Sequence, residues 1–168
     1  MKRIITRTVL WVLVVLWMGM IYNFSAENAD ESLETSDSIV EVVVDRILED
    51  KKDTMSKADY DDFKMKVSHF VRKSAHFAAY MMLGILTLSA LLTHNFKKTT
   101  KSILSLGICF LYAVSDEIHQ EFVPGRAGRF SDVMIDTSGA LLGVVLVLAA
   151  VSIVLRLRKK SHDSGEKI

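Results

Sequence analysis

SILSLGICFLYAVSDEIHQEFVPGR, residues 102–126, joins an apolar run directly to a densely polar one. The apolar run ends at Val114. A helix over its thirteen residues would extend only roughly 20 Å, at about 1.5 Å per residue. A hydrocarbon core of about 30 Å takes about 20 helical residues to cross. We therefore expect a membrane-spanning helix over residues 102–122 whose last turns bring polar side chains to the edge of the bilayer. These side chains are Asp116, Glu117, His119 and Gln120.

The composition favours a small integral membrane protein over a soluble domain. The chain has 168 residues, 50% of them hydrophobic, and a net charge of only +1. Its single cysteine, Cys109, lies within an apolar run and excludes an intramolecular disulfide. The sequence contains no nucleotide-binding glycine loop and no paired-cysteine metal motif. We therefore expect no cofactor and no nucleic-acid partner, and the sequence assigns no metal ligands.

Three further stretches are apolar enough to cross a bilayer: residues 8–24, 70–92 and 133–155. Basic residues precede the first of these, as in a signal peptide, but no small-x-small cleavage site follows it. We interpret it as a retained span. The sequence thus predicts an all-α membrane protein with four transmembrane helices, forming a single domain over residues 1–168.

Charged residues in the connecting segments predict the orientation. Basic residues cluster in the N-terminal segment, in the HNFKKTTK loop at 94–101 and in the tail RLRKK at 156–160. These three segments alternate as expected for a multi-pass protein of the cell membrane with both termini in the cytoplasm. The connection 25–69 instead holds thirteen acidic residues against six basic ones, and we place it outside.

The acidic connection 25–69 contains a predicted amphipathic helix. Apolar side chains recur there at the spacing i, i+3, i+4 and i+7: Val40, Val43, Val44 and Ile47. A similar spacing continues towards the second span with Tyr60, Phe63 and Val67. We interpret the segment as an extracytoplasmic helical insert that packs on the bundle or lies at the membrane interface. A helix dedicated to binding a partner is the alternative.

Ionisable residues gather at the predicted outer end of three spans. In the second span, Arg72, His76 and Tyr80 recur every four residues on one stripe. In the fourth, Asp132 and Asp136 lie one turn apart on one face. Basic and acidic side chains nearly balance at this depth: Arg72, Lys73, Arg126 and Arg129 against Asp116, Glu117, Glu121, Asp132 and Asp136. Because charge inside a bilayer is costly unless compensated, we expect a polar pocket that opens to the outside.

Three stretches resemble the VanZ-like family of small membrane proteins, which is named for a teicoplanin-resistance protein. They are MGMIYNFSAEN at 18–28, RKSAHFAAYMMLG at 72–84 and SDEIHQEFVPGRAGRFSDVMIDTSGALLG at 115–143. The pattern is E-x-x-Q-x-F-x-P-G-R followed by D-x-x-x-(N/D)-x-x-G. The residues that match it here are Glu117, Gln120, Phe122, Pro124, Gly125, Arg126, Asp132 and Gly139, together with Lys73, His76, Phe77 and Tyr80. Asp136 stands where many relatives have asparagine, and the acidic connection is largely unmatched.

The resemblance implies a role in the bacterial cell envelope, namely lowered susceptibility to glycopeptide antibiotics of the teicoplanin type, and it implies no mechanism. Two hypotheses follow from the residues. As a binding or shielding protein, the chain would contact membrane lipids and hold an anionic envelope component such as a lipid-linked cell-wall precursor. As an enzyme, it would modify such a lipid, with His76 and Glu117 as acid and base and Arg126 stabilising a phosphate. We favour binding, because no nucleophile has a partner at motif spacing.

The candidate ligand-binding residues are Arg72, Lys73, Tyr80, Gln120, Arg126, Asp132 and Asp136. Guanidinium groups suit phosphate and carboxylate oxygens. A purely structural interpretation competes with this one, in which a buried Glu–Arg pair and a hydrogen-bonded His76 hold the bundle together. A metal site using His76, His119 and an acid has no ligand spacing to support it. Gly139 and Gly143 form G-x-x-x-G, which predicts close helix packing within the monomer.

Overall fold

The structure, a computed structural model, describes residues 2–26, 40–48, 55–124 and 128–165. Over these ranges every regular element is a helix, which confirms the predicted all-α fold class. The long helices are α1 (Lys2–Ala26), α3 (Lys57–Leu92), α4 (Lys98–Gln120) and α5 (Phe130–Gly165). A short helix covers residues 40–47. The four long helices are all long and apolar enough to cross a membrane, as predicted from the apolar stretches.

Most helix boundaries differ from the predicted spans. Helices α1, α4 and α5 cover residues 2–26, 98–120 and 130–165, where 8–24, 102–122 and 133–155 were predicted, and the start of α3 differs most. Helix α3 begins at Lys57, well before the predicted start at residue 70, so the segment with Tyr60 and Phe63 belongs to the same continuous helix. Its start is fixed by Ser56, whose hydroxyl accepts a hydrogen bond of 3.2 Å from the backbone N–H of Asp59. Helix α4 ends at Gln120 rather than at residue 122, and a turn follows.

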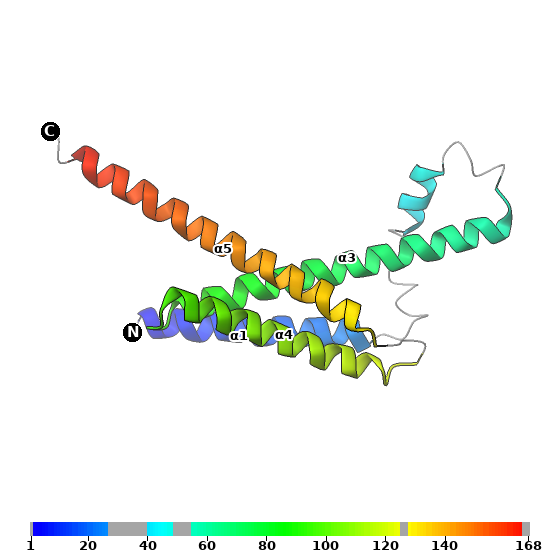
Figure 1. The fold of residues 1–168 in the computed structure, drawn as a ribbon, viewed down its shortest axis with the longest axis horizontal. Helices are drawn as coiled ribbons and strands as arrows, with labels where there is room; N and C mark the ends of the chain where they lie inside the picture. The colour runs from blue at the N-terminus through cyan, green and yellow to red at the C-terminus, as the bar shows by residue number, and fades with distance from the viewer. Residues whose placement is uncertain (1, 27–39, 49–54, 125–127, 166–168) are drawn as a thin grey trace.

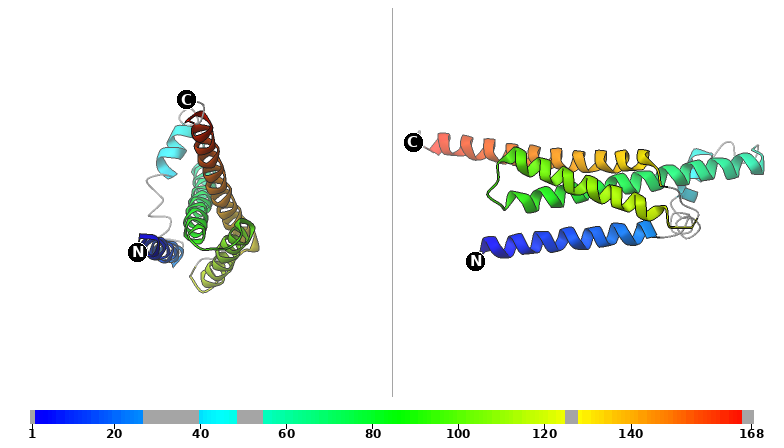
Figure 2. Two further views of the ribbon diagram at one scale, coloured as in Figure 1. Left: turned by 90° about the vertical axis from the view of Figure 1, so that its left-hand side faces the viewer. Right: turned by 60° about the horizontal axis from the view of Figure 1, so that its bottom comes forward.

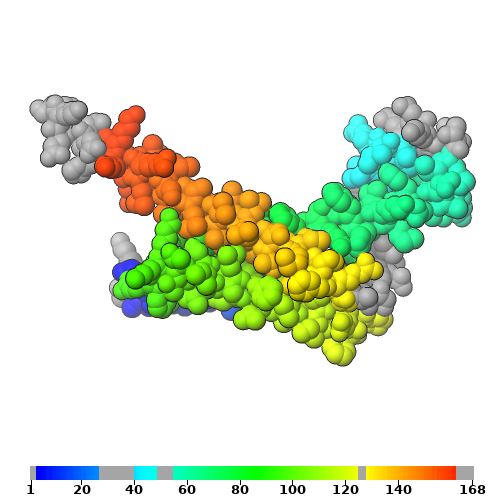
Figure 3. Space-filling view, viewed as in Figure 1, coloured from blue at the N-terminus to red at the C-terminus, as the bar shows by residue number. Residues whose placement is uncertain are grey.

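The four long helices run antiparallel in sequence order, so the connections alternate between the two ends of the bundle. The start of α1, the turn between α3 and α4 and the end of α5 all lie towards the left in Figure 1. These are the segments in which the basic residues cluster. Helix α5 lies over α3 and α4, and its C-terminal half extends beyond them (Figure 3). Helix α1 flanks α3 and α4 on the other side (Figure 2).

Helices α3 and α5 form the most extensive contact in the bundle, and glycines allow it. A Cβ atom added at three positions would collide with a backbone carbonyl on the facing helix: Gly84 with Ala140, Gly139 with Phe77, and Gly143 with Met81. The G-x-x-x-G pair therefore packs inside the monomer, as predicted. The close approach brings the first turns of α5 against the polar stripe of α3.

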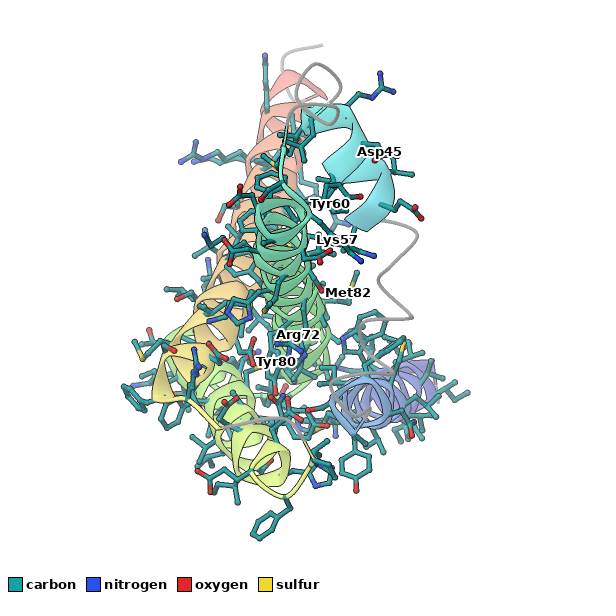
Figure 4. The ribbon with its side chains drawn as sticks, turned by 90° about the vertical axis from the view of Figure 1, so that its right-hand side faces the viewer. Asp45, Lys57, Tyr60, Arg72, Tyr80 and Met82 are labelled. Carbon is teal, nitrogen blue, oxygen red and sulfur yellow. The ribbon has the colours of Figure 1, made fainter. Side chains whose placement is uncertain are left out.

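The short helix 40–47 packs on the N-terminal turns of α3. Val40, Val44 and Leu48 are buried there, against side chains that include Tyr60 and Phe63. Figure 4 shows Tyr60 beside the short helix, which carries Asp45. Ile47, the last apolar residue of the predicted amphipathic pattern, is 59% exposed, because the segment buries every fourth residue. The short helix thus covers the N-terminal turns of α3 that precede the predicted span.

Large apolar side chains cover the outer faces of the bundle. On α1 they include Val15 and Leu16, which are 64% and 65% exposed, and on α5 Leu155 and Leu157 are similarly exposed. In water such surfaces would be unfavourable, whereas lipid chains solvate them. The buried interior is in contrast rich in small and polar residues, as is usual for helices packed within a membrane.

Candidate functional site

A buried polar cluster lies where α3, α4 and α5 meet. It consists of His76 on α3, Asp116 on α4 and Asp136 on α5, and we call it the His–Asp–Asp cluster. One ligand atom from each of the three side chains lies within 4.8 Å of the others. Asp116 and Asp136 are only 4% and 3% exposed. Three helices thus deliver two carboxylates and one imidazole to a single point inside the protein.

The contacts within the cluster leave one carboxylate oxygen unsatisfied. The Nδ1 atom of His76 lies 3.8 Å from Oδ2 of Asp136, within range of an ion pair. The hydroxyl of Tyr80, which is fully buried, donates to Oδ2 of Asp116 at 3.3 Å. The other oxygen of Asp116, Oδ1, is buried and accepts no hydrogen bond from the described residues. Buried polar atoms are normally paired, so this oxygen calls for an explanation.

One helical turn from the cluster, Lys73 and Asp132 form an ion pair between α3 and α5. The Nζ atom of Lys73 lies 2.6 Å from Oδ1 of Asp132, and both side chains are 26% exposed. On each helix these residues precede the cluster residue by one turn or less: Lys73 comes before His76, and Asp132 before Asp136. We call Lys73, Asp132 and the neighbouring Arg72 the rim. Figure 4 views α3 from its N-terminal end, where Lys57 and Tyr60 lie, with Arg72 and Tyr80 further along the helix.

Glu117 forms a hydrogen bond to the connection between α4 and α5. Its carboxylate is 7% exposed and accepts a hydrogen bond from the backbone N–H of Arg129, just before α5 begins. This contact gives Glu117 a structural role at the start of α5. Arg126, predicted to bind a phosphate or to pair with an acid, lies outside the described residues.

Helix α1 closes one side of the site through two contacts. Gln120 donates a hydrogen bond of 2.7 Å to the hydroxyl oxygen of Ser25, which is fully buried near the end of α1. His119 stacks on Tyr22 with ring centroids 4.7 Å apart, and its Nε2 atom is buried without a partner among the described residues. Gln120, predicted to bind ligand, therefore holds α4 to α1 in this structure.

The structure brings together some of the predicted site residues and adds others. His76, Tyr80 and Asp136 meet in the cluster, while Arg72, Lys73 and Asp132 lie on the rim. Sequence reasoning placed Asp116 in the polar pocket but gave it neither a catalytic nor a ligand-binding role. A signal for it existed, because Asp116 follows Cys109 and Ala113 on a buried stripe of α4. It likewise assigned no role to Tyr22 or Ser25, although both lie in the stretch MGMIYNFSAEN.

Buried carboxylates beside an imidazole support two kinds of chemistry. The imidazole can accept or give a proton while a carboxylate orients its ring. Carboxylate oxygens and an imidazole nitrogen are also ligands for divalent metal ions. The rim adds a cationic ammonium at the edge of the site, which suits an anionic oxygen.

Comparison with known protein families identifies a family for this chain. The family model described as VanZ/LLP1 matches residues 10–154. This range holds the cluster, the rim, helices α3 and α4 and most of α5. Neither the curated proteins nor the solved structures give a match.

Proposed function

The chain belongs to the VanZ/LLP1 family, and from this premise we propose that it binds an anionic component of the bacterial cell envelope and so lowers susceptibility to teicoplanin-type antibiotics. The bound component would be a lipid-linked cell-wall precursor or another envelope lipid with a phosphate or carboxylate group. Binding would hold or shield this component at the outer surface of the cell membrane.

The observation that carries this proposal is the position of Lys73. Its ammonium group is half-buried on the rim, and Asp132 accepts the one hydrogen bond that it makes to the described residues. An ammonium has three donors, so two remain for the oxygens of a ligand. Arg72 on the same turn and Arg129 beside Glu117 add positive charge nearby, and guanidinium groups bind phosphate oxygens well. Arg126, in the same connection as Arg129, would add a further guanidinium.

Charge distribution supports an outward-facing rim. The basic N-terminal segment, the α3–α4 turn and the end of α5 gather at the opposite end of the bundle from the rim. Because positively charged segments stay in the cytoplasm, both termini would lie inside and the rim outside. A ligand on the outer leaflet would then reach Lys73 without crossing the bilayer.

A membrane-embedded enzyme is the second candidate, and one distance favours it. Nδ1 of His76 lies 3.8 Å from Asp136, an arrangement in which a carboxylate orients an imidazole base. Such an enzyme would change a lipid or lipid-linked precursor by acid/base chemistry near the rim. Glu117 supports this role less well, because its carboxylate already accepts the backbone N–H of Arg129.

The test is to express the Lys73→Met variant in a teicoplanin-susceptible bacterium and to measure the inhibitory concentration at matched amounts of folded protein. We expect the variant to lose the protection that the parent protein gives. The matched control is Lys66→Met on the same helix, because Lys66 is 74% exposed and forms an ion pair with Asp62 one turn away, outside the rim. Equal protection by the parent and the Lys73→Met variant would contradict the binding proposal.

Lipid mass spectrometry separates the two candidates. The purified protein is incubated with a lipid-linked cell-wall precursor, and the lipids are analysed over time. A binding protein retains the precursor at unchanged mass, in proportion to the protein present. An enzyme converts many molecules of precursor per protein molecule, and its product has a new mass.

A further inference from the structure

We propose that His76, Asp116 and Asp136 together bind one divalent transition-metal ion, such as Zn²⁺ or Mn²⁺, inside the helical bundle. The site would be built by three helices, with one ligand from each. This inference concerns the buried cluster and does not depend on the proposed binding of an anion at the rim.

Geometry is the first support. The candidate ligand atoms lie within 4.8 Å of one another. Nitrogen and oxygen ligands lie about 2.0–2.2 Å from zinc, so two ligands of one ion are separated by at most roughly 4.4 Å. Small rotations of the side chains would close the remaining difference. The ring of His76 also lies where its Nδ1 atom faces Asp136.

The unsatisfied oxygen of Asp116 is the second and independent support. This side chain is 4% exposed, and its Oδ1 atom is buried and accepts no hydrogen bond from the described residues. A carboxylate oxygen left in this way costs folding free energy. A metal ion at the cluster would coordinate it. The hydroxyl of Tyr80, which holds the other oxygen at 3.3 Å, would then orient the ligand as outer-shell partners of metal sites commonly do.

Charge compensation is the third support. Two ionised carboxylates buried among apolar helices are costly unless positive charge lies close by. Lys73, one turn away on α3, is held 2.6 Å from Asp132 and so compensates a different carboxylate. Protonated His76 would supply one positive charge. A divalent ion with a neutral imidazole would supply two and make the cluster neutral.

The donor set indicates the class of metal. One imidazole nitrogen with two carboxylate oxygens suits borderline ions such as Zn²⁺ and Mn²⁺, whereas Ca²⁺ and Mg²⁺ prefer oxygen ligands alone. Three protein ligands are the number found in zinc sites that keep a position open for water or a ligand. If the proposed function holds, an anion bound at Lys73 would lie about one helical turn, roughly 5.4 Å, from that position.

The test measures metal content directly. The full-length protein, purified in detergent with a tag that contains no histidines, is saturated with Zn²⁺ or Mn²⁺, freed of excess metal and analysed by mass spectrometry of the elements. We expect about one metal ion per chain. The variant Asp136→Asn should have a lower affinity for the metal. The decrease should exceed the roughly 10- to 100-fold that loss of an outer-shell partner causes, because Asp136 is itself a proposed ligand. Asparagine is a mild change here, because it has nearly the size of aspartate and removes only the charge.

A matched control and a second readout complete the experiment. Glu121→Gln alters an exposed acid next to the end of α4 and should keep the metal at the parent level. Removing metal with a chelator should lower the thermal stability of the parent and of Glu121→Gln, and re-addition should restore it, whereas Asp136→Asn should show neither change. X-ray absorption of the loaded parent should show imidazole ligation that is lost in His76→Gln.

Two outcomes would overturn the proposal. Metal content of the saturated parent no higher than that of Asp136→Asn would show that the cluster binds none. Equal stability of the parent with and without metal would show that any bound ion is adventitious. The Lys73→Met variant distinguishes the two proposals, because loss of the anion site should leave the metal in place.

Discussion

Lys73 and Asp132 join the two most closely packed helices of the bundle through a 2.6 Å ion pair that is only partly exposed. The same two helices continue inward to His76 and Asp136, which are 3.8 Å apart. The interface between α3 and α5 is therefore polar at one end and depends on glycine contacts beyond it. Stability and function are both expected to depend on this interface.

The rim pair should show measurable coupling. Single changes Lys73→Met and Asp132→Asn each leave one charge without its partner, and the double variant removes both. Fully buried pairs cost about 3–5 kcal/mol when broken, but this pair is 26% exposed and solvent screening reduces the effect. We expect a coupling energy on the order of 1 kcal/mol in a double-mutant cycle of unfolding in detergent. Additive losses would show that the two residues do not interact directly.

Replacing glycines by alanine should show whether close contact between α3 and α5, rather than helix propensity, determines the stability of the protein. Gly139→Ala and Gly143→Ala place a methyl group against the backbone of α3, which cannot move away as a side chain could. We expect each to destabilise the protein by about 1–3 kcal/mol. Gly107→Ala is the control, since nothing lies within 4 Å of an added Cβ there. That change should be neutral or stabilise by up to about 1 kcal/mol, because alanine favours helix. Thermal unfolding in one detergent compares the three variants.

Orientation can be tested with single cysteines. The native Cys109 is buried and should react slowly. In intact cells, a membrane-impermeant thiol reagent should label Asp61→Cys, at the exposed start of α3, and should not label Thr99→Cys, in the first turn of α4. Both positions should react after the membrane is opened. The reverse pattern in intact cells would place the rim in the cytoplasm and remove the support for binding an outer-leaflet component.

The four spans could be predicted from the sequence because each depends on a local property, the length of an apolar run. The residues at which the helices begin and end could not be predicted in this way. Helix α3 continues back to Lys57 through polar turns, which the short helix 40–47 covers by packing on Tyr60 and Phe63. Leu48 is buried and Ile47 is exposed for a similar reason, because contact with α3 determines which face of the short helix is covered.

Partners across helices could be predicted only in part. The spacing of His76 and Tyr80 placed them on one face of α3, and the structure confirms that both point to the cluster. Nothing local to DEIHQ distinguishes Asp116 from Glu117, because neighbouring residues on a helix differ by about 100° in direction. Their different contacts follow from how α4 packs against its neighbours, since Asp116 meets Tyr80 of α3 and Glu117 meets the backbone of Arg129 before α5. The rim pairing of Asp132 with Lys73 likewise depends on the glycine contact between α3 and α5.

Glu117 provides the last prediction, because its structural and catalytic roles give opposite results in one variant. Its carboxylate oxygen accepts the backbone N–H of Arg129 just before α5. Glutamine keeps a carbonyl oxygen at that place but cannot act as a general acid or base at neutral pH.

If the role is structural, Glu117→Gln should retain thermal stability and antibiotic protection close to those of the parent. Glu117→Ala should lower both, because the part-buried backbone N–H of Arg129 loses its acceptor, which costs on the order of 1 kcal/mol. Folded protein is quantified in detergent and compared with the inhibitory concentration of teicoplanin for each variant. A Glu117→Gln protein that is stable yet gives no protection would instead assign the chemistry to Glu117, since only its ability to exchange a proton has then been removed.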